Sequence, residues 1–260
     1  SPFAFTGNKF EFRMCGSSFS IADPNVVLNT IVAESLRQFA DILENASDLK
    51  NELTTLIKKT ISDHKRIIFN GNNYADEWVR EAEKRGLSNL KNTVEALPTL
   101  VSEKSVDLFT CHNVFSESEV HSRYEIMLEN YSKTLRIEAL TMIDLVKKEI
   151  LPACITYQNE LLQLLSSKKA YGQYECGLEE HLLDKISKLS NCALKKLNIL
   201  ENLMLETNGN DDALSVAKFY RDKVFAAMSE LRLIVDELET LVARKYWPLP
   251  VYAEILYSVI

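Results

Sequence analysis

Glycine and proline are scarce in this sequence, with seven and six residues among 260. Both residues interrupt regular secondary structure, so their scarcity argues against a turn-rich β fold and favours long, uninterrupted helices. No block of lysine and arginine is present, and the net charge is −7 with a pI of about 5.3. Because an acidic surface repels phosphate backbones and anionic lipids, we expect no general binding to nucleic acid or to membrane surfaces.

Paired cysteines are also missing. The cysteines are odd in number and form no Cys-x-x-Cys pair: Cys15, Cys111, Cys154, Cys176 and Cys192. A chain of this length can bury enough apolar surface to fold without disulfides, so we expect a reduced, cytoplasmic setting. No secretory leader and no membrane-spanning apolar run is visible. Since strand-like apolar residues follow directly on Ser1, we expect the chain to start inside a structural element, as a fragment does.

Apolar residues recur with helical spacing through most of the chain. Asp23-Pro24 is typical of a helix start, Ser116-Glu117-Ser118-Glu119 is a capping box, and Gly86 is typical of a helix end. Pro152 is expected to kink or end the helix that contains it. Three long amphipathic helices joined by short turns predict an antiparallel bundle. The predicted helices cover residues 23–43, 49–61, 76–85, 116–165, 178–203 and 212–241.

The first 21 residues lack this helical spacing. Phe10-Glu11-Phe12-Arg13 alternates apolar and charged residues, which predicts a strand with two different faces. A second short apolar piece, residues 65–69, predicts another strand or extended segment before a turn at Asn70-Gly71-Asn72-Asn73. The predicted fold class is therefore mainly α, with a short N-terminal β segment followed by a long antiparallel helical bundle.

Three charged residues of the N-terminal strand share one face. Side chains alternate along a strand, so Lys9, Glu11 and Arg13 point to one side while Phe10 and Phe12 point to the other. A carboxylate between two cations can bind a divalent metal ion while the cations hold phosphate or carboxylate oxygens. The same pattern also fits a solvated strand face with cross-strand ion pairs. The residues alone leave both interpretations open.

The Lys9-x-Glu11-x-Arg13 strand resembles the Arg-x-Glu-x-Arg strand near the end of the catalytic domain of glutamine synthetases. The preceding residues 1–8 and the following Gly16-Ser17-Ser18 and Asp23-Pro24-Asn25 are similar to the type III class of that family. Further similarity lies in Arg66-Ile67-Ile68-Phe69-Asn70-Gly71-Asn72-Asn73-Tyr74 and in Lys245-Tyr246-Trp247-Pro248-Leu249-Pro250-Val251-Tyr252. The resemblance covers nearly the whole chain and places it in the C-terminal part of such an enzyme.

The resemblance implies a domain organisation and roles for the three residues. Residues 1–46 would end the catalytic domain, and residues 47–260 would form the helical C-terminal domain of the type III class. Glu11 would be a ligand of Mg²⁺ or Mn²⁺, Arg13 a clamp for the substrate and the transferred phosphoryl group, and Lys9 a contact for the phosphates of ATP. Lys9 stands where other classes have arginine, and lysine offers a point charge instead of a planar fork.

The implied activity is ATP-dependent synthesis of glutamine from glutamate and ammonia through γ-glutamyl phosphate, in a double-ring homo-oligomer. The fragment alone would be inactive, because the remaining catalytic groups would lie upstream of Ser1. The alternative is a non-enzymatic helical scaffold or oligomerisation module, since most of the chain is amphipathic helix without a catalytic motif.

A second group of possible metal ligands lies at Cys111 and His112, with Glu117, Glu119 and His121 close by in the sequence. This group matches no His-Glu-x-x-His pattern. Helix capping explains the glutamate and serine residues of this segment without a metal ion.

Overall fold

A computed structural model of the chain describes residues 3–5, 10–12, 20–72, 74–206 and 212–257. They divide into a first unit, Ser1–Tyr124, and a second unit, Glu125–Ile260, with the boundary inside one helix. Most described residues are helical, which confirms the predicted mainly α fold with a helical bundle. Among the described residues, no helix combines the length and apolar character that crossing a bilayer requires.

The N-terminal residues contribute a small two-stranded sheet. Strands β1 (Phe3–Phe5) and β2 (Phe10–Phe12) pair in antiparallel orientation, with Ala4 opposite Glu11 in the centre of the pair. The three residues of β2 are the central part of the segment in which the sequence predicts a strand. The neighbouring Lys9 and Arg13 lie outside the described residues.

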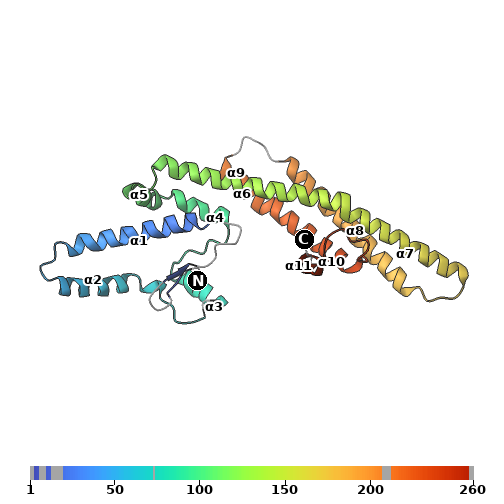
Figure 1. Cartoon of the computed structure of the whole chain (residues 1–260), viewed down its shortest axis with the longest axis horizontal. Helices are drawn as coiled ribbons and strands as arrows, with labels where there is room; N and C mark the ends of the chain where they lie inside the picture. The colour runs from blue at the N-terminus through green and yellow to red at the C-terminus, as the bar shows by residue number, and fades with distance from the viewer. Residues whose placement is uncertain (1–2, 6–9, 13–19, 73, 207–211, 258–260) are drawn as a thin grey trace. The chain divides into compact units, whose positions relative to one another are not determined.

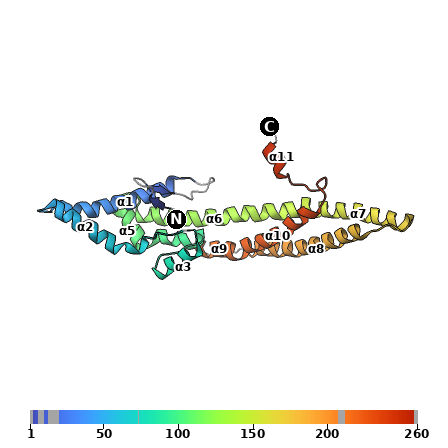
Figure 2. The same ribbon diagram turned by 90° about the horizontal axis from the view of Figure 1, so that it is seen from below.

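The first unit continues as a series of mostly short helices around one helical hairpin. Helices α1 and α2 form this hairpin, and α1 also contacts α5 (Figures 1 and 2). The helix α1 starts one residue before the predicted cap, where the Ser20 hydroxyl accepts a hydrogen bond from the amide of Ala22. The bounds are α1 Ala22–Leu43, α2 Leu49–Asp63, α3 Asp76–Lys84, α4 Thr93–Ala96 and α5 Glu103–Cys111, with 3₁₀ turns at Lys65–Ile67 and Leu97–Val101.

The segment after α2 corrects one prediction. Residues 65–69 are predicted as a strand or extended segment. Residues Lys65–Ile67 form a 3₁₀ turn instead, whereas Ile68 has an extended backbone and pairs with no strand. The guanidinium of Arg85 donates to the carbonyl oxygens of Arg66 (3.2 Å) and Ile68 (2.9 Å). The same guanidinium lies over the stacked rings of Phe69 and Trp78. These side-chain interactions replace the backbone pairing that a strand would need.

The second unit is built from long helices around one core. Helix α8 packs against both α7 and α10, and the short connection between α7 and α8 makes them antiparallel neighbours, as Figures 1 and 2 show. Fully buried Ile186, Leu197, Leu200 and Leu231 lie in this core. The bounds are α6 Glu117–Leu145, α7 Leu151–Tyr171, α8 Gly177–Leu205, α9 Ala213–Phe219, α10 Phe225–Leu241 and α11 Tyr252–Tyr257.

Two π-helical turns join these helices end to end. Residues Val146–Ile150 connect α6 to α7, and Tyr220–Val224 connect α9 to α10. The helix therefore does not end at Pro152, which lies in the first turn of α7. Proline lacks an N–H and clashes with the carbonyl four residues before it, and a wider turn accommodates both defects. The amide of Leu151 accordingly donates to the carbonyl of Val146, five residues earlier.

Candidate functional site

The predicted catalytic strand is described only by its backbone. Glu11 lies at the centre of β2, with Phe10 and Phe12 on either side of it in the strand. Lys9 and Arg13 fall outside the described residues, so their positions stay predictions. What the structure contributes is the pairing of β2 with β1, which gives Glu11 an extended backbone held by a neighbouring strand. Alternating side-chain direction is a property of such a paired strand.

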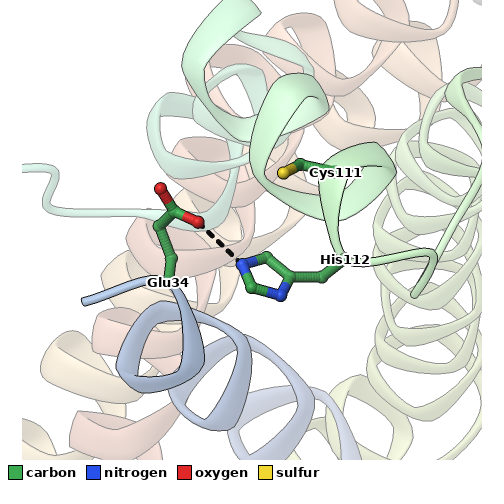
Figure 3. Close-up of side chains that lie close together, drawn as sticks. All are labelled: Glu34, Cys111 and His112. Atoms are coloured by element: carbon green, nitrogen blue, oxygen red, sulfur yellow. Dashed lines mark hydrogen bonds and ion pairs between the residues drawn. The ribbon is translucent and has the colours of Figure 1, made fainter. Parts of the chain in front are cut away.

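A second candidate site is formed by Glu34, Cys111 and His112 in the first unit. Glu34 comes from the middle of α1, Cys111 is the last residue of α5, and His112 follows it as the helix C-cap. One ligand atom of each side chain lies within 4.8 Å of the other two. Figure 3 shows the carboxylate of Glu34 facing the imidazole of His112, with the thiol of Cys111 beside them.

The contact between α1 and α5 in this site is a direct polar one. His112 Nε2 lies 2.8 Å from Glu34 Oε2, a hydrogen-bond distance. The two side chains are 18 % and 21 % exposed, whereas Cys111 is exposed. The site is therefore half-shielded on the imidazole and carboxylate side and accessible to solvent at the thiol.

Glu34 is held in place by its own helix. Arg37 donates to both carboxylate oxygens, from Nη2 to Oε1 (2.8 Å) and from Nε to Oε2 (3.0 Å), and Gln38 donates to Oε1 (2.6 Å). The hydrogen bonds from Arg37, Gln38 and His112 keep the pKa of the Glu34 carboxyl well below its usual value of 4.5. Glu34 is therefore an ionised ligand with a fixed orientation, and Arg37 is also paired with Asp41 at 2.9 Å.

The sequence singled out only part of this site. The sequence groups Cys111 and His112 with Glu117, Glu119 and His121 as possible ligands, but in the structure Glu119 belongs to the predicted capping box. Its carboxylate accepts from the amide of Ser116 at 2.8 Å, and the Ser116 hydroxyl accepts from the amide of Glu119 at 3.4 Å. The carboxylate next to Cys111 and His112 is instead that of Glu34, which lies 78 residues before His112 in the sequence. No local sequence pattern connects Glu34 with His112.

The second unit contains a groove with a volume of about 850 Å³ along α6 and α10. Its lining is mainly apolar and includes Met142, Val146, Met228 and Leu231, which also belong to or pack against the bundle core. Its polar lining includes Arg232 and Asp236, which pair with each other at 3.4 Å. The groove is therefore a mainly apolar surface that continues from the bundle core.

Comparison with known proteins shows which family the chain resembles. Residues 52–169 match the family described as the glutamine synthetase C-terminal domain. Over 99 % of its length the chain is 39 % identical to a glutamine synthetase of Butyrivibrio fibrisolvens and to the type-3 glutamine synthetase of Dictyostelium discoideum. It is 30 % identical to a glutamine synthetase of Bacteroides fragilis.

Over nearly its whole length the chain is similar to glutamine synthetases, and residues 52–169 match the C-terminal domain of that family. These matches confirm the resemblance that the sequence suggested, and one of the relatives carries the type-3 name. The chain spans 36–37 % of the length of the curated relatives that it matches.

Proposed function

We propose that this chain is the C-terminal part of an ATP-dependent glutamate–ammonia ligase and supplies one strand of its active site. The observation that carries the proposal is the placement of Glu11 in a paired strand, between Lys9 and Arg13 in the sequence, within a chain of this family. A lone Lys-x-Glu-x-Arg pattern is common, but the similarity to named glutamine synthetases extends over nearly every residue of the chain.

The reaction proposed for the intact enzyme has two steps. The γ-carboxylate of glutamate attacks the γ-phosphorus of ATP to give γ-glutamyl phosphate and ADP, and ammonia then displaces phosphate to give glutamine. Negative charge accumulates around the transferred phosphoryl group, and cations fixed near it lower the barrier. In this chain Arg13 would contact glutamate and the phosphoryl group, and Lys9 the nucleotide phosphates.

Glu11 would hold a divalent metal ion, Mg²⁺ or Mn²⁺. A carboxylate suits this role because hard divalent cations prefer oxygen ligands. When bound, such an ion offsets the charge on the phosphates. A single carboxylate does not complete the site, so the remaining ligands would come from the rest of the enzyme, and the fragment alone would be inactive.

The proposed domain boundary after residue 46 has support from the family match, which starts at Glu52 in α2. On this proposal the sheet and α1 end the catalytic domain, and the helices from α2 onward form the C-terminal domain. The compact units divide after Tyr124 instead. The two divisions describe different properties, because one follows packing within the chain and the other follows the extent of the family.

The test of the proposal is the variant Glu11→Gln in the full-length enzyme. It removes the charge while keeping the size of the side chain, and glutamine formation should fall on the order of 100-fold or more, as expected when a ligand of an essential metal ion is lost. The exposed Glu125→Gln in α6 is the matched control and should keep full activity. Unchanged turnover in Glu11→Gln, with native circular dichroism in both variants, would remove Glu11 from the active site.

The helical region is proposed to serve assembly as well, in a cytoplasmic double-ring homo-oligomer. The support is that long helices with many exposed apolar side chains dominate the second unit, for example Ile137, Leu205 and Leu233. Light scattering of the full-length protein checks this point, and a mass equal to one chain contradicts it.

A further inference from the structure

The site formed by Glu34, Cys111 and His112 has a chemistry that glutamine synthesis does not use. It brings together one carboxylate, one thiol and one imidazole, from two different helices of the first unit (Figure 3). We infer that these three side chains form a binding site for a divalent transition-metal ion, with Zn²⁺ as the ion that fits best.

The ligand set selects the kind of metal. Zn²⁺ is commonly held by cysteine sulfur, histidine nitrogen and carboxylate oxygen, and three protein ligands leave a fourth position for water. Mg²⁺ and Ca²⁺ prefer oxygen ligands alone, so a thiol and an imidazole disfavour them. The exposed thiol of Cys111 leaves the open position accessible from solvent.

The spacing of the three side chains suits a tetrahedral ion. Metal–ligand bonds of about 2.0 to 2.3 Å place the ligand atoms of a tetrahedral site on the order of 3.5 Å apart. Here all three ligand atoms already lie within 4.8 Å of one another, and His112 Nε2 and Glu34 Oε2 are 2.8 Å apart. Small side-chain rotations therefore suffice, with the ion taking the place of the hydrogen that His112 and Glu34 share.

The charges around the site also balance. A thiolate and a carboxylate together neutralise a doubly charged ion. The nearby guanidinium of Arg37 is shared between Glu34 and Asp41, so it has a second anionic partner when Glu34 binds a metal. Arg37 Nη2 and Gln38 hold Oε1 of Glu34, while Oε2 accepts from Arg37 Nε and faces His112. Hydrogen bonds of this kind orient metal-binding carboxylates.

The alternative is that His112 and Glu34 form only a polar contact that joins α1 to α5. That interpretation gives Cys111 no role, whereas the metal site requires its sulfur. A measurement that depends on the sulfur atom of Cys111 therefore separates the two.

The experiment is titration of the metal-free, reduced full-length protein with Co²⁺, which replaces Zn²⁺ and absorbs light. We expect one Co²⁺ per chain with sulfur-to-cobalt charge-transfer absorption, and this absorption should disappear on adding Zn²⁺ but persist in excess Mg²⁺. Cys111→Ser should abolish the charge-transfer band, and Glu34→Gln or His112→Gln should weaken Co²⁺ binding by about 10-fold to 100-fold or more.

The control variant is Cys192→Ser, which removes an exposed cysteine in α8 of the second unit and should leave the absorption unchanged. Absence of the charge-transfer band in the native protein, or an equal band in Cys111→Ser, overturns the inference. Because Cys111 is exposed, its replacement by serine leaves the buried core untouched, and circular dichroism verifies the fold. The charge-transfer absorption does not depend on glutamine formation, so its result is independent of the role proposed for Glu11.

Discussion

The two units of the chain differ in how much apolar surface they bury. In the first unit, the buried hydrophobic side chains among the described residues are Leu56, Val94, Phe109 and Val120. The second unit buries a single cluster of nineteen side chains along α6 to α10. Hydrophobic burial is the dominant favourable term in folding, so the second unit has the means to fold by itself.

The first unit relies more on local polar and aromatic contacts. Arg85 joins Phe69, Trp78 and two carbonyl groups, and Glu34 joins α1 to His112 at the end of α5. The apolar sides of its hairpin stay exposed, with Leu49, Leu53, Ile57 and Ile61 at four-residue spacing on α2. Helices with similar apolar stripes can therefore be either exposed or buried, depending on whether a partner helix covers the stripe.

The largest effect should come from the core of the second unit. Leu197→Ala removes a fully buried side chain of α8 and should lower the unfolding free energy of this unit by about 2–5 kcal/mol. Ile199→Ala on the same helix, 47 % exposed, should cost much less. Hydrogen exchange measured on peptides of each unit checks this, because the two units need not unfold together. Equal losses in both variants would contradict the assigned core.

Replacing the buried carboxylate of the second unit should cause a smaller loss of stability than the change in its core. Glu179 in α8 is 5 % exposed and pairs with Lys168 of α7 at 2.5 Å, whereas the neighbouring pair of Glu180 and Lys169 is exposed. Glu179→Gln should therefore destabilise the second unit more than Glu180→Gln does at neutral pH, because it removes the negative charge that pairs with the partly buried Lys168.

The pH dependence of this pair follows from its pKa shifts. The hydrogen bond from Lys168 lowers the pKa of Glu179 below its usual 4.5, so the stabilisation is complete above 4.5 and is lost as the pH falls to the lowered pKa. The pKa of Lys168 is raised above 10.5 by the same bond, so its contribution is lost only as the pH rises through that raised value. Denaturation of native and Glu179→Gln protein should converge in acid, and a constant difference would contradict the pairing.

A still smaller loss of stability is expected from changes at the start of α2 in the first unit. The carboxylate of Asp48 caps this helix by accepting from the amide of Asn51 at 3.2 Å. Asp48→Ala should cost about 1 kcal/mol locally, while Asp48→Ser keeps a capping oxygen and most of the stability. Faster hydrogen exchange in α2 peptides of the alanine variant alone is the expected result, and identical exchange in both would show that the cap does not contribute.

The smallest effect should come from the exposed stripe of α2. Leu53→Gln replaces a side chain that is 43 % exposed and should change the stability of this chain by no more than about 0.5 kcal/mol. Leu56→Ala, three residues away and 8 % exposed, is the contrast and should cost about 2 kcal/mol or more. A large loss in Leu53→Gln would show that the stripe is covered, and the difference between the units would then be smaller than described.

Several features could be predicted from the sequence because they depend on interactions within one or two helical turns. The capping box at Ser116 and Glu119, the helix start near residue 212, where Asp212 caps α9, and the left-handed Gly86 after α3 are of this kind. The 3₁₀ turn at residues 65–67 could not be predicted in this way, because Arg85 stabilises it from 17 to 19 residues away. The sequence predicts that Pro152 kinks or ends its helix, and the structure excludes the end, because the helix continues through a π turn.

The sequence by itself determined the helix-rich fold, the approximate extent of the long helices and the resemblance to glutamine synthetases, since these follow from residue spacing and from similarity along the whole chain. Only the tertiary structure decided that Glu34 meets Cys111 and His112, and which apolar stripes become core. Such contacts depend on how helices distant in the sequence pack against one another, and the periodicity of each helix specifies an apolar face without specifying its partner.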